Sequence, residues 1–237
     1  MITTRTVGHA HDGTALEGVL AVDQGAGPRP AVIVLHTFAG RGENEVAVAG
    51  RLAGLGYAGF AADLYGKGVL GRTREESSAL MRPFLDDRAR LQDRMLAIVE
   101  AVRALPEVDA TRVAAIGYCF GGLCVLDLAR TGADVRGVAS FHGLFGAPGN
   151  REGTPIRAKV VAYHGWDDPM VPPEAVTALA AELSAAGADW QIHGYGGTMH
   201  GFTNPKANAP ENGVLYNAVA ARRSWESLKL FLAECFS

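Results

Sequence analysis

The stretch "RVAAIGYCFGGLCVLDLAR" (residues 112–130) joins two apolar segments through a cysteine set between glycines. The first segment, rich in Val, Ala and Ile, predicts a buried strand, and the second predicts a helix. Gly117, Cys119 and Gly121 fit the pattern G-x-C-x-G, in which a sharp strand-to-helix turn exposes the middle side chain. Taken alone, the pattern fits a small buried cysteine equally well, because free cysteines are among the most buried residues.

Apolar runs and segments of helical periodicity alternate on both sides of this turn. We expect strands at 17–22, 31–36, 57–65, 112–118, 135–143, 159–165 and 190–195, and helices at 43–55, 75–105, 121–130, 172–187 and 214–236. The long helical stretch carries Pro83, near which we expect it to divide in two. Strands separated by helices predict an α/β fold, a doubly wound, mostly parallel sheet with helices on both faces. A length of 237 residues favours a single domain, residues 1–237.

The composition excludes several classes of function. A net charge of -3, with 22 dispersed Lys and Arg residues, gives no basic surface for nucleic acid. No apolar stretch reaches the length of a membrane span, and the first residues do not resemble a secretion signal, so we expect a cytoplasmic protein without a membrane partner. Three cysteines without C-x-x-C spacing predict free thiols rather than disulfides or a zinc site.

Two later loops supply the partners that a nucleophilic cysteine needs. The segment "HGWDDPMVP" places Asp167 and Asp168 after a predicted strand, where an acid can orient a catalytic base. The segment "GGTMHGF" places His200 in a glycine-rich loop after the next strand. The chain order of nucleophile, acid and base is typical of α/β-hydrolases, and it favours Cys119 as a nucleophile over the buried alternative.

The sequence resembles the dienelactone hydrolase (carboxymethylenebutenolidase) family over nearly its whole length. The matching segments are "ADLYG" (62–66), "GYCFGG" (117–122), "GWDDPMVPPE" (165–174) and "HGFTNP" (200–205). The resemblance implies a single-domain α/β-hydrolase with a Cys-Asp-His triad, carried here by Cys119, Asp168 and His200. Asp168 fits the family's D-x-x-V-P pattern, and Asp167 is the alternative acid. In this mechanism the thiol attacks an ester or lactone carbonyl, and no metal or organic cofactor is needed.

Two backbone N–H groups are candidates for the oxyanion hole. The amide of Phe120 lies at a predicted helix N-terminus, and the resemblance assigns the second donor to Phe38. The family's activating glutamate is replaced by Thr37, and one of its carboxylate-binding arginines is replaced by Asn204. With Tyr65, these two residues are our candidate substrate contacts. Because of these two departures, the resemblance supports the hydrolase fold and the triad more firmly than it supports dienelactone as the substrate.

Other polar residues near the predicted loops have structural interpretations. His36, His142 and His164 end predicted strands, where hydrogen-bonded structural histidines are expected. Glu43 and Glu45 lie at a predicted helix start, where we expect solvated capping carboxylates.

The sequence thus predicts a hydrolase of small esters or lactones that works through a covalent acyl-enzyme, as a monomer or homodimer. One alternative is a general carboxylesterase or thioesterase on the same fold. Another is a catalytically silent α/β-hydrolase that binds a ligand, an interpretation that the missing glutamate favours.

Overall fold

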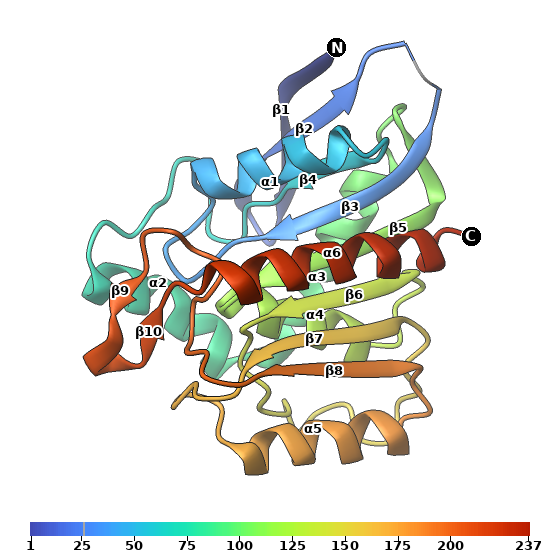
Figure 1. Cartoon of the computed structure of the whole chain (residues 1–237). Coiled ribbons are helices and arrows are strands. Elements are labelled where there is room, and N and C mark those ends of the chain that lie inside the picture. The colour runs from blue at the N-terminus through green and yellow to red at the C-terminus, as the bar shows by residue number, and fades with distance from the viewer. Residues whose placement is uncertain (26) are drawn as a thin grey trace. The chain divides into compact units, whose positions relative to one another are not determined.

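The computed structural model describes residues 1–25 and 27–237 (Figure 1). The chain divides into two units, residues 1–116 and 117–237. Both units combine strands with helices, and parallel strand pairs occur in each of them, which confirms the predicted α/β class. The assignment of residues 1–237 to one domain stays a prediction.

The first unit contains four complete strands and three helices among its described residues. They are β1 (Ile2–His11), β2 (Thr14–Asp23), β3 (Arg29–Leu35), α1 (Glu43–Ala53), β4 (Ala58–Ala61), α2 (Arg74–Asp86) and α3 (Arg88–Arg103), and β5 (Val108–Tyr118) ends in the next unit. Strands β3 and β4 are parallel, whereas β2 pairs antiparallel with both β1 and β4. The sequence prediction missed β1, because most of its side chains are exposed and give little apolar signal.

The helical stretch predicted over residues 75–105 is two helices, but the break lies at Asp87 rather than near Pro83. Pro83 lies inside α2, and its carbonyl accepts the Asp87 N–H at 3.2 Å, which closes the last turn. The Asp87 side chain then accepts the Arg90 N–H at 3.0 Å and caps α3. The helix boundary lies at the capping aspartate, and Pro83 is accommodated within the last turn of α2.

The second unit holds a set of parallel strands covered by helices. Its elements are α4 (Phe120–Arg130), β6 (Gly137–Phe141), β7 (Lys159–Gly165), α5 (Pro173–Ala185), β8 (Trp190–Tyr195), β9 (Asn208–Ala209), the 3₁₀ turn η1 (Pro210–Asn212), β10 (Val214–Leu215) and α6 (Ala218–Cys235). Helices α4 and α6 both pack on β6, and Figure 1 shows them on opposite faces. The last helix begins at Ala218 rather than at residue 214, because the Asn217 side chain accepts the N–H groups of Val219 and Ala220.

The burial of β6 and β7 explains why these two strands could be recognised from the sequence. Every residue of β6, and every residue of β7 after Lys159, is buried. Such uninterrupted burial is typical of parallel strands covered on both faces. Among the helices of the described residues, none has the length and apolar character needed to cross a bilayer.

Candidate active site

Cys119 lies at the turn between β5 and α4. Its φ of 55° and ψ of -113° form a combination that residues other than glycine rarely adopt. Backbone hydrogen bonds hold this strained residue: its N–H donates to the Phe141 carbonyl at 3.0 Å, and its carbonyl accepts the N–H groups of Gly122 at 3.0 Å and Leu123 at 3.3 Å. The side chain is half-buried, in contrast to the other two cysteines, which are buried. The turn therefore presents Cys119 as the sequence pattern predicts.

Gly117 allows this turn because it has no side chain. A Cβ atom there would lie 2.0 Å from the Gly121 carbonyl oxygen and 2.2 Å from the Gly121 carbonyl carbon. Both atoms belong to the backbone of the first turn of α4, so they cannot move aside without distorting the Cys119 turn.

We expect Gly117→Ala to lower the free energy of unfolding by about 3 kcal/mol, because the added methyl group overlaps backbone atoms. Chemical denaturation followed by circular dichroism measures the loss. Gly8→Ala is the matched control, since a Cβ atom at Gly8 has no atom within 4 Å. This control should change stability by less than about 0.5 kcal/mol. Equal losses in the two variants would contradict the steric explanation.

His200 and Asp168 form a buried pair. The His200 Nδ1 atom lies 2.7 Å from Oδ2 of Asp168, and the two side chains are 6% and 0% exposed. The other carboxylate oxygen accepts the Met170 N–H at 2.9 Å, so both oxygens are bonded. Asp167 is exposed, and its N–H donates to the Thr198 carbonyl at 2.9 Å. Of the two neighbouring acids, the structure brings Asp168 to the imidazole.

The backbone of His200 is held on both sides. Its N–H donates to the Gly213 carbonyl at 2.9 Å, and its carbonyl accepts the Leu215 N–H at 3.1 Å. These bonds form a bridge to Val214 in β10. The imidazole is thus carried by a backbone with little freedom to shift.

The charge of the His200 imidazole is set by opposing effects. Burial lowers its pKa, but the hydrogen bond to Asp168 and the interaction with Cys119 outweigh burial and raise the pKa to about 10. The Nε2 atom is buried and has no hydrogen-bond partner of normal geometry among the described residues. With Nδ1 held by Asp168, Nε2 is the nitrogen that can exchange a proton.

A second histidine, His142, lies beside the first. The centres of the two imidazole rings are 5.2 Å apart in an edge-to-face arrangement. The His142 Nε2 atom is 2.8 Å from Oγ1 of Thr203. Burial and the nearby charge of His200 lower the pKa of His142 well below its ordinary value, so this ring is neutral at neutral pH.

The other two strand-end histidines differ from each other. His36 matches its structural interpretation: its Nδ1 is 2.6 Å from the Thr37 carbonyl, and its Nε2 accepts the Leu64 N–H at 3.2 Å. His164 does not match, because neither of its ring nitrogens has a hydrogen-bond partner among the described residues. Its ring lies instead against Phe145, with the ring centres 5.5 Å apart.

The candidate residues of the first unit lie on the loop after β3 and on the segment after β4. The Thr37 carbonyl accepts the Gly40 N–H at 3.3 Å in a tight turn. The Tyr65 hydroxyl donates to the Phe38 carbonyl at 3.0 Å, so it supports the loop that carries the candidate oxyanion donor. The sequence does not predict this bond, because no sequence pattern links a tyrosine hydroxyl to a main-chain carbonyl 27 residues away.

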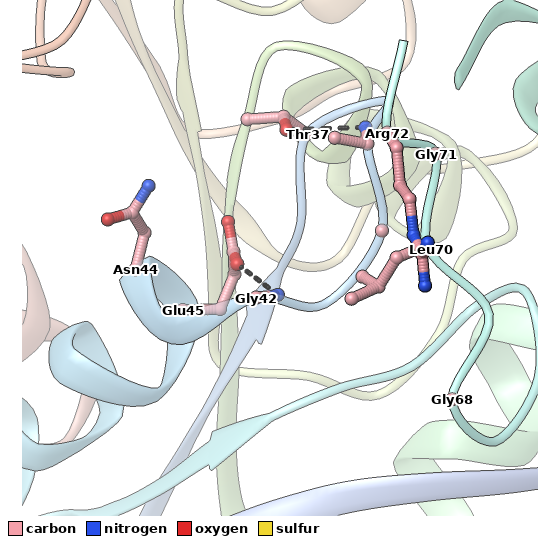
Figure 2. Close-up of a pocket in the computed structure, with 10 residues that line it drawn as sticks. Thr37, Gly42, Asn44, Glu45, Gly68, Leu70, Gly71 and Arg72 are labelled. Atoms are coloured by element: carbon pink, nitrogen blue, oxygen red, sulfur yellow. Dashed lines mark hydrogen bonds between the residues drawn. The ribbon is translucent and has the colours of Figure 1, made fainter. Parts of the chain in front are cut away.

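A pocket of about 330 Å³ opens beside this loop within the first unit. Figure 2 shows that Thr37, Glu45 and Arg72 border it. Glu45 caps α1 by accepting the Gly42 N–H at 2.8 Å, as expected, but its side chain is buried rather than solvated. The helix start is therefore stabilised by a carboxylate that also borders the pocket.

The remaining candidates lie in the second unit. Phe120 is the first residue of α4, so its N–H lies at the positive end of the helix dipole. Asn204 is exposed, and its side-chain oxygen accepts the Lys206 N–H at 3.0 Å, so it stabilises a surface turn.

An α/β fold whose buried acid–histidine pair follows parallel strands is that of an α/β hydrolase. The sequence profile of the dienelactone hydrolase family matches residues 16–236. The chain belongs to this family, whose members hydrolyse esters and lactones, and the resemblance noted from the motifs is confirmed.

Individual relatives agree with this assignment. The crystal structure of a dienelactone hydrolase-like promiscuous phosphotriesterase, P91, from metagenomic libraries has 36% identity and a TM-score of 0.92, and the match covers 100% of this chain and 99% of that one. A protein of Synechocystis sp. named "Putative carboxymethylenebutenolidase" is 28% identical, with 98% of both chains covered. A protein of Bradyrhizobium sp. named "Probable 2-oxo-3-(5-oxofuran-2-ylidene)propanoate lactonase" is 25% identical, over 87% of this chain and 84% of that protein.

Proposed function

We propose that this protein cleaves small carboxylic esters or lactones through a triad of Cys119, Asp168 and His200 and a covalent acyl-enzyme. The observation that carries the proposal is the buried contact of 2.7 Å between the imidazole and the carboxylate of Asp168. This contact fixes the tautomer and the ring orientation, so that Nε2 is available for the thiol proton. The strained turn at Cys119 supports the role of that thiol as the nucleophile.

The proposed reaction has two stages. The thiol of Cys119 gives its proton to Nε2 of His200, and its sulfur adds to the carbonyl carbon, which forms a C–S bond and an oxyanion. The amides of Phe120 and Phe38 are the proposed donors to this oxyanion. The C–O bond then breaks, and the leaving oxygen takes the proton from the imidazole. In the second stage, water gives a proton to Nε2, attacks the thioester and releases the acid and the free thiol.

The proposal accounts for the missing glutamate. Thr37 is neutral and cannot take the thiol proton, so His200 has to form the thiolate. The raised pKa of His200 supports this, because an imidazolium paired with Asp168 stabilises a nearby thiolate. The scheme requires no metal or organic cofactor. Tyr65, Thr37 and Asn204 remain the candidate substrate contacts.

One relative favours a second activity. The name of the structure at 36% identity describes a promiscuous phosphotriesterase. The same thiolate could attack a phosphotriester, so that a P–S bond forms and a P–O bond breaks, and water would then release the phosphodiester. We propose this reaction as a side activity of the Cys119 site.

A trapping experiment tests both activities. The protein is incubated with p-nitrophenyl acetate, an enol lactone, a simple thioester and paraoxon, and p-nitrophenolate release is measured where it applies. Rapid acid quenching followed by peptide mass spectrometry should find an acyl group on the peptide that contains Cys119. Faster turnover of the thioester would favour the thioesterase alternative. Absence of both turnover and adducts on every substrate would favour the silent, ligand-binding alternative.

A further inference from the structure

We infer that His142 and Thr203 are positioning residues that hold His200 at a fixed place relative to the Cys119 turn. This inference rests on the proposed function, since it concerns the geometry of the proposed triad. For this purpose the Cys119 turn is residues 117–121, and the His200 loop is residues 196–207.

The first link joins the end of β6 to the His200 loop. His142 follows β6 directly, and its N–H donates to the Tyr163 carbonyl of β7 at 2.8 Å. Its φ of 38° is in the left-handed region, so the chain leaves the strand sharply at this point. Its side chain then contacts Thr203 through the 2.8 Å bond between Nε2 and Oγ1. Since Thr203 follows His200 closely in the same loop, this bond ties the loop to the sheet.

The second link joins the same point of the sheet to the nucleophile. The Phe141 carbonyl accepts the Cys119 N–H at 3.0 Å. Phe141 and His142 are consecutive, so one main-chain carbonyl holds the Cys119 turn and the next side chain holds the His200 loop. The separation between thiol and imidazole is therefore set by a short, rigid connection through the end of β6.

The packing of the His142 ring makes this connection stiff. The ring is 2% exposed and lies edge-to-face against Phe202, with the ring centres 5.2 Å apart, as well as against the imidazole of His200. Both neighbours belong to the His200 loop. A buried ring held between them leaves little room for the loop to shift.

The titratable groups around His200 are compatible with an imidazolium at that position. The titratable groups that act on it are Asp168 after β7, Cys119 at the turn, His142 after β6 and His164 in β7. His142 and His164 both have lowered pKa values, chiefly because of burial, so neither opposes an imidazolium at neutral pH. Without the Thr203 hydroxyl, the buried Nε2 of His142 would lose its partner, and an unpaired buried nitrogen favours rearrangement of the ring.

The test removes the hydroxyl and keeps the side-chain shape. In Thr203→Val we expect kcat for p-nitrophenyl acetate to fall by about 10- to 100-fold with little change in KM, because small displacements of catalytic groups are costly. Alkylation of Cys119 by iodoacetamide at neutral pH should slow by about tenfold, because less thiolate is stabilised. Thr203→Ser keeps the hydroxyl and should restore both rates to within about threefold of wild type.

Two further variants separate positioning from general loosening of the loop. Thr198→Val is the matched control, because Thr198 lies in the His200 loop but does not bond to His142. Its hydroxyl accepts the Asn217 side-chain N–H at 3.0 Å. In this variant both the turnover rate and the alkylation rate should stay near wild type. His142→Phe keeps the ring packing but loses the nitrogen, so it should resemble Thr203→Val, and the double variant should show no further loss. Wild-type rates in Thr203→Val, an equal loss in Thr198→Val, or failure of Thr203→Ser to restore the rates would each overturn the inference.

Failure of the proposed function can be told apart from failure of this inference. If wild-type protein shows neither turnover nor an acyl adduct, the proposed function is wrong, but the alkylation rates and the titration of His200 still test the positioning. Imidazole NMR, assigned with His200→Gln, should show the His200 pKa moving in Thr203→Val from about 10 toward its ordinary value of about 6.5. An unchanged titration together with an unchanged alkylation rate would overturn the inference.

Discussion

Cys119→Ala is expected to abolish ester hydrolysis, with kcat/KM for p-nitrophenyl acetate lower by about 10⁴-fold or more. An alanine cannot form the thioester, so only binding and the oxyanion donors would remain to accelerate the reaction. Initial rates of p-nitrophenolate release measure the loss, and mass spectrometry should find no acylated protein. Residual turnover above about one per cent of wild type would contradict the assignment of the nucleophile.

The chain offers a matched control for this variant in the same helix. Cys124 lies in α4, five residues after Cys119, and its side chain is fully buried. Cys124→Ala removes a thiol of the same type and should keep activity within about threefold, while unfolding free energy falls by about 1 kcal/mol. Loss of activity in Cys124→Ala with retention in Cys119→Ala would place the reactive thiol elsewhere. Comparison of Cys119→Ala with Cys124→Ala therefore distinguishes loss of a reactive thiol from loss of a packed side chain.

The Cys119 turn could be predicted because its physical requirement is local. Gly117 has no space for a Cβ atom against Gly121, so the glycine spacing in the sequence reports directly on the close approach of strand and helix. The buried strands were equally clear, since uninterrupted apolar runs are typical of parallel strands. The same reasoning explains what was missed: β1 has mostly exposed side chains and therefore a weak pattern.

The contacts around His200 could be predicted only in part. Residue types and chain order indicated an acid and a histidine, and the family's D-x-x-V-P pattern favoured Asp168 over Asp167. The burial that distinguishes Asp168 from its exposed neighbour arises only in the folded chain. The bond between His142 and Thr203 joins residues that are 61 positions apart, and its polar partners have no shared pattern. Such side-chain contacts depend on how a strand end and a loop meet, which no local periodicity encodes.

Asp168→Asn is expected to lower kcat for p-nitrophenyl acetate by about 10³- to 10⁴-fold with a smaller change in KM. An amide is isosteric with the carboxylate and can still accept the Met170 N–H, so the loop should keep its shape. The amide has no charge, however, and its NH₂ group favours the wrong imidazole tautomer. Loss of the Asp168 hydrogen bond and charge should also lower the His200 pKa from about 10, which imidazole NMR can measure.

Asp167→Asn is the control, because it makes the same chemical change one position away on an exposed side chain. Its activity should stay within about threefold of wild type, and the His200 pKa should not move. Denaturant unfolding of both variants would show whether a loss of activity follows from lost stability. If Asp167→Asn lost activity and Asp168→Asn kept it, the acid assignment would be wrong. Because the two substitutions are chemically identical, a difference in activity and in the His200 pKa at equal stability would come from the buried contact of Asp168 with the imidazole.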